Sequence, residues 1–264
     1  MISWTKVKFD DIDCLNAAAR SLDELNESLT EENIEEVCKI FWAFYILNYK
    51  GNDELQNFLQ NYIERNFEHI GINHALDLFI SFSSINSDNL NVFELLIELI
   101  MRNYESAEIT MDINNYVNIW LGLSKFYLQC KEKSLESVSL MLRFLLHNYN
   151  IRPYLNVSNM TYDEMCSMLV CLSALSMEPN KIYSDLGSSI KENISKFNTI
   201  QLIQLLSCGK YLFNTKKHSN LYFLVHDALV SSKSTFDSVQ SKAIVRILKN
   251  DGIITDSIFL DYKQ

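Results

Sequence analysis

The segment Val37–Leu47, with the sequence VCKIFWAFYIL, decides the fold. Its large apolar side chains recur at offsets of 0, 3, 4, 7 and 10 residues, which is the stripe of an amphipathic helix of about three turns. The members of this stripe are Val37, Ile40, Phe41, Phe44 and Leu47. Such a face is favourable only when another element covers it, so the segment predicts one helix of a larger helical assembly.

The same stripe returns four more times along the chain, and we term these helices the A helices. Successive copies start 38, 41, 49 and 37 residues apart, which is typical of a solenoid of repeated units. The four further stripes are Ala75, Leu78, Phe79, Phe82, Ile85; Tyr116, Ile119, Trp120, Leu123, Phe126; Met165, Met168, Leu169, Leu172, Leu175; and Leu202, Leu205, Leu206, Gly209, Leu212. At Gly209 a partner helix is expected to approach closely.

A second stripe follows each A helix after 18 to 22 residues, and we term these helices the B helices. The pattern predicts an all-α fold, a right-handed α-solenoid of about five helix-turn-helix repeats of roughly 38 residues with degenerate capping helices. The B stripes are Leu55, Phe58, Leu59, Tyr62, Ile63; Phe93, Leu96, Ile97, Ile100, Met101; Val138, Met141, Leu142, Leu145, Leu146; Tyr183, Leu186, Gly187, Ile190; and Leu221, Leu224, Val225, Ala228, Leu229.

The pattern divides the chain into residues 1–29, an N-terminal extension with a capping helix; residues 30–231, the hairpin array; and residues 232–264, a degenerate C-terminal cap. The N-terminal capping helix is expected over Asp13–Leu25, with Leu15, Ala18, Ala19, Leu22 and Leu25 inward. A worn A helix is expected over Phe236–Leu248 and a short closing element over Ile253–Phe259. Terminal repeats are atypical because one face has no neighbour.

Polar residues mark where the A helices start. Thr161 with Glu164 forms a capping-box pattern, and the segment Ile151–Met160 is a longer connection that accounts for the spacing of 49 residues. The start signals are Thr30, Asn73, Asp112, Thr161 and Asn198.

Composition supports helices and restricts the partners. Only 6 glycines and 2 prolines occur, and the formal charge of −10 at pH 7 repels a phosphate backbone, so nucleic-acid contact must be local. Asparagine is frequent, which we attribute to an AT-rich coding sequence. The six cysteines lack metal-ligand spacing and indicate reduced, packed thiols. The apolar run Ile40–Leu47 is too short to span a bilayer, so we expect no membrane insertion.

No motif in the chain supports catalysis, a cofactor or a metal. The segment Ser207–Lys210 lacks the upstream glycine of a phosphate-binding loop. His69 and His74 are five residues apart, as are Cys166 and Cys171, and this spacing on a helix does not bring both side chains to one ion. We therefore expect no enzyme, no cofactor and no metal site.

Lysines give the one candidate contact with RNA or phosphate. Lys125 and Lys210 flank the stripes of their A helices, and Lys131, Lys133, Lys216 and Lys217 lie in the A-to-B loops of the same two repeats. Aligned hairpins place such loops along one edge, where the lysines would contact phosphate. Alternatively these are solubilising loops, and we favour this interpretation because charge runs are usually solvated.

The stripes of Val37–Leu47 and Ala75–Ile85 resemble the heptatricopeptide and octotricopeptide repeats of organellar RNA-associated proteins, which often carry a RAP domain. The resemblance covers residues 33–231, and the segment after Lys249 is too short for a RAP domain. It implies an adaptor or structural subunit of a mitochondrial ribonucleoprotein such as the mitoribosome, with other proteins as partners, RNA at a local basic edge and no DNA. Residues 1–13 are not Arg-rich, so the resemblance alone implies the mitochondrial location. The alternatives are an organellar factor that binds RNA for processing or stability, and a cytosolic scaffold for protein–protein interaction.

Overall fold

The structure is a computed structural model that describes residues 12–25, 28–47, 49, 53–83, 85, 90–106, 111–129, 136–177, 180–208, 219–231 and 238–251. Over these residues it is helical throughout and contains no strand. The chain divides into two compact units, residues 1–148 and residues 149–264. The all-α prediction is therefore confirmed for the described part of the chain.

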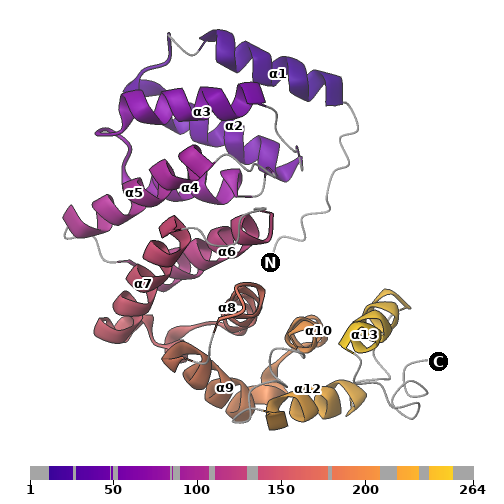
Figure 1. The fold of residues 1–264 in the computed structure, drawn as a ribbon. Coiled ribbons are helices and arrows are strands. Elements are labelled where there is room, and N and C mark those ends of the chain that lie inside the picture. Colours follow the sequence, from indigo (N-terminus) through magenta and orange to yellow (C-terminus); the bar gives the residue numbers. More distant parts are fainter. Residues whose placement is uncertain are drawn as a thin grey trace. The chain divides into compact units, whose positions relative to one another are not determined.

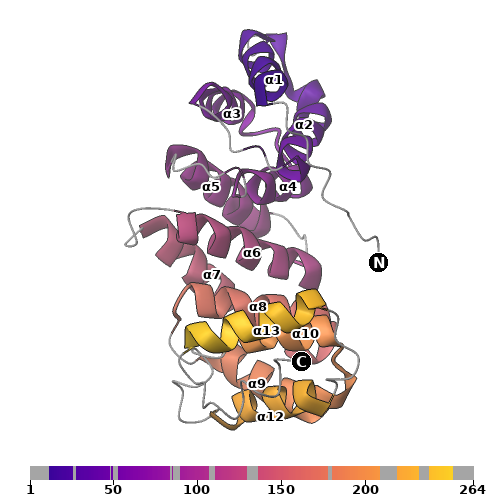
Figure 2. The same cartoon turned by 90° about the vertical axis from the view of Figure 1, so that its right-hand side faces the viewer.

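Unit 1 contains two sets of helices, each packed in chain order (Figure 1). The A helix α2 packs on α4 and α4 on α6, while α1 packs on α3 and α3 on α5. Figure 2 shows α3 and α5 on one side and α2 and α4 on the other. The elements are α1 (Ile12–Leu25), η2 (Glu31–Asn33), α2 (Ile34–Ile46), α3 (Asp53–Asn66), α4 (Ile72–Phe82), α5 (Leu90–Ser106), α6 (Ile113–Gln129) and α7 (Glu136–Ile151), whose last turn belongs to the second unit.

Unit 2 shows the same arrangement. The A helix α8 packs on α10 and α10 on α13, while α9 packs on α12. The predicted worn A helix is thus α13, whereas the closing element expected over Ile253–Phe259 lies outside the described residues. The elements are η3 (Pro153–Leu155), η4 (Val157–Asn159), α8 (Tyr162–Ala174), α9 (Lys181–Asn193), η5 (Ile194–Lys196), α10 (Thr199–Ser207), α12 (Ser219–Ser231) and α13 (Ser238–Asp251).

The predicted stripes form the core. Every member of the second, third and fourth A stripes is buried, and so is every member of the first B stripe. Gly209 and Leu212 lie outside the described residues. The prediction for the first capping helix is partly wrong, because Ala18 is exposed and Leu25 is 53% exposed. Helix α1 packs mainly on α3, and because it has this single main neighbour, a narrower face of α1 is covered than the stripe predicts.

One buried contact recurs at the same repeat position in both units. Cys38 Sγ donates to the carbonyl of His74 at 3.8 Å, and Cys166 Sγ donates to the carbonyl of Gln201 at 3.6 Å. Each cysteine directly follows the first residue of an A stripe, and each carbonyl belongs to the residue just before the next A stripe. Successive A helices therefore meet in the same phase in these two places.

A second recurring contact ends the B helices. Four asparagine side chains, ten or eleven residues after the start of a B stripe, donate to the carbonyl four residues earlier at 2.8–2.9 Å. In α12 the Ser231 hydroxyl donates to the Asp227 carbonyl at 2.8 Å. Each side chain is a second donor to a carbonyl that also accepts the backbone amide of the same asparagine, so asparagine has a local role at these positions. The four asparagines are Asn66, Asn103, Asn148 and Asn193.

The start signals are confirmed with one exception. Thr161 and Glu164 form the predicted capping box, Asn198 accepts from the Gln201 amide at 3.0 Å, and Asp112 accepts from the Asn115 amide at 2.7 Å. Asn73 does not cap, because α4 begins earlier with Gly71 at the N-cap position. The long connection over Ile151–Met160 contains η3 and η4, and the division between the units falls just before it.

The close approach of α6 to α4 requires Gly122. A Cβ atom at this position would overlap two carbon atoms of the Phe79 ring. That ring stacks on Phe93 with a centroid distance of 5.5 Å, and Phe93 stacks on Phe126 in α6. Because the Phe79 ring stacks on Phe93, which is itself held by Phe126, Phe79 has little freedom to yield.

We predict that Gly122→Ala lowers the free energy of unfolding by about 2 kcal/mol, measured by urea unfolding. Overpacking of a dense core costs about 1–3 kcal/mol, which outweighs the better helix propensity of alanine. The matched control is Asn114→Ala at an exposed position of the same helix, which we expect to leave stability unchanged or slightly raised. The additional substitution Phe79→Leu should reduce the effect of Gly122→Ala. Equal stability of Gly122→Ala and Asn114→Ala would contradict the packing described.

Burial also controls the reactivity of the two cysteines that join A helices. It raises the pKa of Cys38 and of Cys166 to about 12, so at about pH 8 only about one thiol in 10⁴ is ionised. We predict that both resist an aromatic disulfide reagent in the folded protein and react in urea, whereas the exposed Cys14 reacts without denaturant. Peptide mapping of the labelled sites measures this. Labelling of Cys166 at the rate of Cys14 in the native protein would show that the thiol is not enclosed.

Candidate interaction surface

Two aromatic side chains and one lysine form a platform on the A helices of unit 1. Trp42 and Tyr45 come from α2, and their ring centroids are 5.0 Å apart. Lys125 comes from α6 and places Nζ 4.9 Å from the centroid of the Tyr45 ring, within the range of a cation–π interaction. We term Trp42, Tyr45 and Lys125 the aromatic platform.

The position of Trp42 on its helix explains why it is available. Phe41 and Phe44 occupy the stripe of α2 and are buried, so Trp42, which directly follows Phe41, points to another side. Trp42 is consequently 42% exposed. A large aromatic ring held at the surface by a rigid helix offers area for a partner at low entropic cost.

A shallow cavity of about 480 Å³ adjoins the platform at Trp42. Its other walls are residues of α2, including Glu35 and Lys39, and residues of α4, including His74 and Asp77. Glu35 and Lys39 form an ion pair of 2.6 Å, and the hydrogen bond to Lys39 lowers the pKa of Glu35. Both side chains are about two-thirds exposed, so this pair adds little to stability but offsets the charge of Lys39.

Asp77 adds a further acidic group to this cavity. Partial burial raises the pKa of its carboxyl group above the ordinary value. Asp77 and Glu35 place two carboxylates beside the aromatic platform, to which Lys125 contributes a positive charge. The surface therefore suits an aromatic or apolar group with at most one local negative charge.

Only one of the six predicted lysines can be placed. Lys125 is half-buried beside its stripe, as predicted, and contacts Tyr45. The other five, Lys131, Lys133, Lys210, Lys216 and Lys217, lie outside the described residues. The sequence reasoning missed Trp42 and Tyr45, although large aromatic residues outside the stripe of an amphipathic helix are a usable signal.

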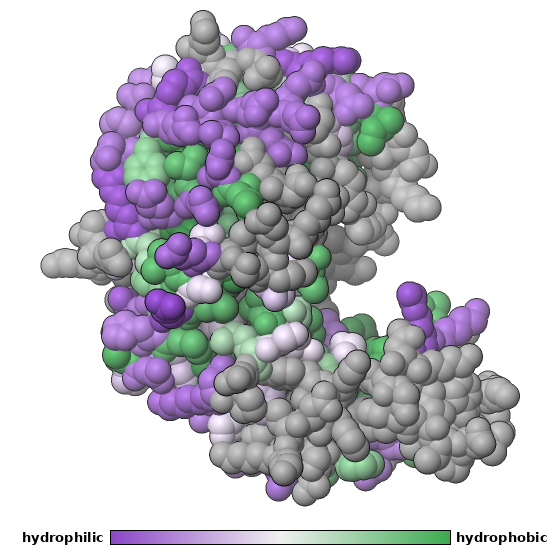
Figure 3. All heavy atoms as spheres, viewed as in Figure 1, coloured by the Kyte–Doolittle hydropathy of each residue, from purple (hydrophilic) through white to green (hydrophobic). Residues whose placement is uncertain are grey.

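A second concave surface lies between α5 and α7. In the space-filling view, the surface over α1 and α3 is largely hydrophilic, whereas apolar residues come to the surface around α5 and α7 (Figure 3). Apolar area that stays exposed on a folded domain is typical of an interaction site.

Other chemistry finds little support in the described residues. They contain no group of three or more histidine, cysteine, aspartate or glutamate side chains placed to hold a metal ion. His69 lies in the turn after α3 and His74 within α4, so these two residues do not share a helix. No described helix combines the length and apolarity needed to cross a membrane.

Comparison with known proteins adds no family to this description. No protein-family model matches the chain. A search of curated proteins also finds no match.

We predict that Trp42→Ala changes the free energy of unfolding by less than about 1 kcal/mol, since the ring is half in solvent. Trp120→Ala is the matched comparison, because the Trp120 ring is fully buried, and removing a buried tryptophan costs about 3–5 kcal/mol. Urea unfolding of both variants measures the difference. If Trp42→Ala destabilises the protein as much as Trp120→Ala, then Trp42 is a core residue and not part of a binding surface.

Proposed function

We propose that the protein is a non-catalytic helical-repeat scaffold, an α-solenoid of about five hairpins, that serves as an adaptor or structural subunit of an organellar ribonucleoprotein such as the mitochondrial ribosome. The observation that carries the scaffold proposal is the recurrence of one contact between successive A helices, from Cys38 to His74 and from Cys166 to Gln201. Solenoids of this kind present long surfaces to partners. The mitochondrial setting rests on the resemblance to the heptatricopeptide repeats.

Charge favours proteins as the main partners. The chain carries 33 acidic and 23 basic residues, and a phosphate backbone would be repelled by most of such a surface. The carboxylates of Glu35 and Asp77 lie next to the aromatic platform. A partner that brings apolar and basic side chains gains from this surface, whereas a bare RNA strand does not.

Direct RNA binding is the second candidate, and the aromatic platform is the observation in its favour. A base that stacks on an exposed aromatic ring gains about 1–3 kcal/mol, and a neighbouring lysine can meet one phosphate. Trp42 and Lys125 provide one such pair.

A cytosolic scaffold for protein–protein interaction is the third candidate. The concave surface between α5 and α7 supports it, because such a surface can bind a peptide in any compartment.

A salt titration of binding to labelled single-stranded RNA separates the first two candidates. The adaptor proposal predicts weak binding at about 150 mM salt that Trp42→Ala and Lys125→Ala do not change. An RNA-binding factor would bind tightly, lose affinity steeply with salt, and lose about tenfold or more in Trp42→Ala. Lys191→Ala, at an exposed position of α9, is the control for removal of one positive charge.

Sedimentation of the endogenous protein tests the assembly itself. We expect the chain, whose own mass is 30.7 kDa, to sediment with a large particle from a mitochondrial lysate and to leave that particle when its protein components are dissociated. Sedimentation as a free chain of that mass, outside mitochondria, would contradict the proposal.

A further inference from the structure

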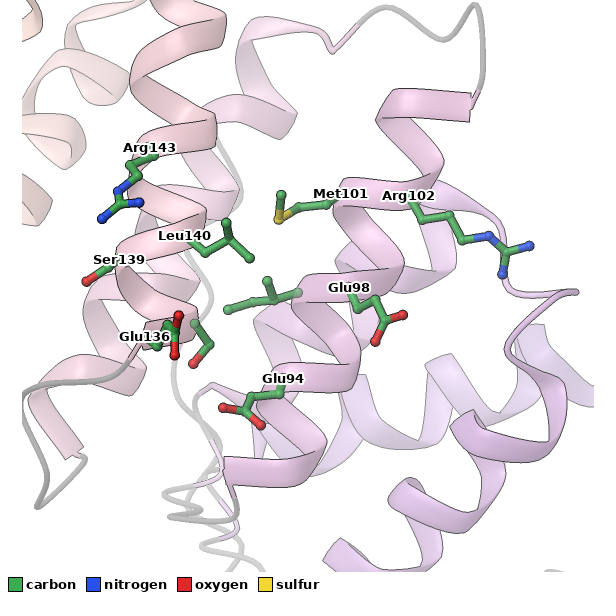
Figure 4. Close-up of a pocket in the computed structure, with 10 residues that line it drawn as sticks. Glu94, Glu98, Met101, Arg102, Glu136, Ser139, Leu140 and Arg143 are labelled. Atoms are coloured by element: carbon green, nitrogen blue, oxygen red, sulfur yellow. The ribbon is translucent and has the colours of Figure 1, made fainter.

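A groove of about 810 Å³ lies between α5 and α7 in unit 1 (Figure 4). In the same set of helices α3 packs directly on α5, whereas the next pair leaves this space between its side chains. Met101 of α5 and Leu140 of α7 point toward one another across it, and Ile97 lines it as well. Leu140 is 47% exposed, although it projects from a helix whose other face is in the core.

The groove is lined by five charged residues, which are Glu94, Glu98 and Arg102 of α5 and Glu136 and Arg143 of α7. Glu94 of α5 and Glu136 of α7 lie at one end, and neither carboxylate has an ion-pair partner among the described residues (Figure 4). Arg143 lies further along α7 and is likewise without an ion pair in the part of the chain described. In Figure 4 the side chains of Glu98 and Arg102 extend from α5 away from α7, and that of Arg143 extends from α7 away from α5. Arg102 is bonded to Glu68 and lies 5.2 Å from the centroid of the Phe67 ring.

The spacing of these charges matches a helix. Glu136 and Arg143 are seven residues apart in α7, which corresponds to about 10 Å, or two helical turns. A helix laid along the groove presents positions i, i+3, i+4 and i+7 on one face. A basic side chain at i would meet the two facing carboxylates, apolar side chains at i+3 and i+4 would cover Met101 and Leu140, and an acidic side chain at i+7 would meet Arg143.

We infer that this groove binds an amphipathic α-helix of a partner protein, with a basic turn over Glu94 and Glu136 and an acidic turn two turns away at Arg143. The inference rests on the proposed adaptor function and names the partner chemistry for it. Two carboxylates that face each other beside apolar side chains repel, and a cation between them relieves that repulsion. The same carboxylates disfavour RNA in this place.

The test uses the full chain with ¹³C-methyl methionine and three synthetic peptides of about 18 residues, or five helical turns. The first peptide carries the apolar stripe with lysine at i and glutamate at i+7. The second has the same stripe with glutamate at both i and i+7, so that it places no cation over the two carboxylates in either helix direction. The third has the composition of the first with the stripe scrambled. We expect the first to shift the Met101 methyl signal and to leave that of the buried Met168 unchanged. Met101→Leu assigns the signal.

Two variants locate the peptide. Glu94→Lys should weaken binding of the first peptide about fivefold or more, as expected for the loss of one partly exposed charge contact and its replacement by a repulsive one. Glu192→Lys makes the same charge change at an exposed position of α9 and should leave binding unchanged. A version of the first peptide with glutamate at i should bind Glu94→Lys better than it binds the wild type. Leu140→Asp should abolish binding, and its unfolding midpoint in urea checks that the fold is retained.

The inference is overturned if the first and third peptides give the same response at Met101, if Glu94→Lys and Glu192→Lys bind alike, or if an RNA oligonucleotide shifts Met101 more strongly than the first peptide. Self-association of the chain through the groove would also overturn it, and sedimentation of Leu140→Asp against the wild type detects this. If the peptides fail while the endogenous protein still sediments with a large particle, the groove assignment alone is wrong. If both fail, the adaptor function falls as well.

Discussion

The dominant constraint on this molecule is that a single helical hairpin cannot bury its own apolar stripes. At about 25 cal/mol per Å² of apolar surface, the stripes stabilise the fold only when the hairpins before and after cover them. This requires successive A helices to meet in the same phase. The contacts from Cys38 to His74 and from Cys166 to Gln201 show that phase in both units, with a thiol and a carbonyl at equivalent repeat positions. Gly122 shows how tight the requirement is, since α6 reaches α4 only where a side chain is missing.

The same constraint determines where partners can bind. Most stripe residues are covered by the neighbouring hairpins, so recognition falls to side chains outside the stripes and to the few stripe residues, such as Met101, that no hairpin fully covers. Trp42 and Tyr45 lie outside the stripe of an A helix, and Leu140 lies outside that of a B helix. The separation of α5 from α7 adds a second kind of surface, because a place where two helices of one set do not close on each other leaves apolar side chains for a partner.

Much of the helical core was predictable from the sequence because apolar periodicity reports burial directly. The stripe from Ala75 to Ile85 is buried throughout, and capping chemistry predicted the start of α8 at Thr161. Two predictions were wrong for local reasons. Gly71 takes the N-cap position that was expected near Asn73, and α1 has only one main neighbour, which leaves Leu25 exposed.

The asparagines near the ends of the B helices were recognisable from the sequence, because the pairs Asn66-Phe67, Asn103-Tyr104 and Asn148-Tyr149 repeat at equivalent positions. A compositional argument ignores position and therefore missed them. The groove was not predictable, since the stripes of α5 and α7 do not encode the distance between the two helices.

Deletion of one complete repeat tests the central claim most directly. Removal of residues 75–115 joins His74 to Tyr116 and puts the third A stripe in the place of the second, in phase with the first. If neighbouring hairpins share one phase, this shortened chain retains its helical circular dichroism per residue and unfolds cooperatively in urea. A matched deletion of the A helix alone, residues 72–85, should lose that cooperativity. If the chain without residues 75–115 loses helical circular dichroism and cooperative unfolding to the same extent as the chain without residues 72–85, the hairpins are not equivalent units and the account is wrong.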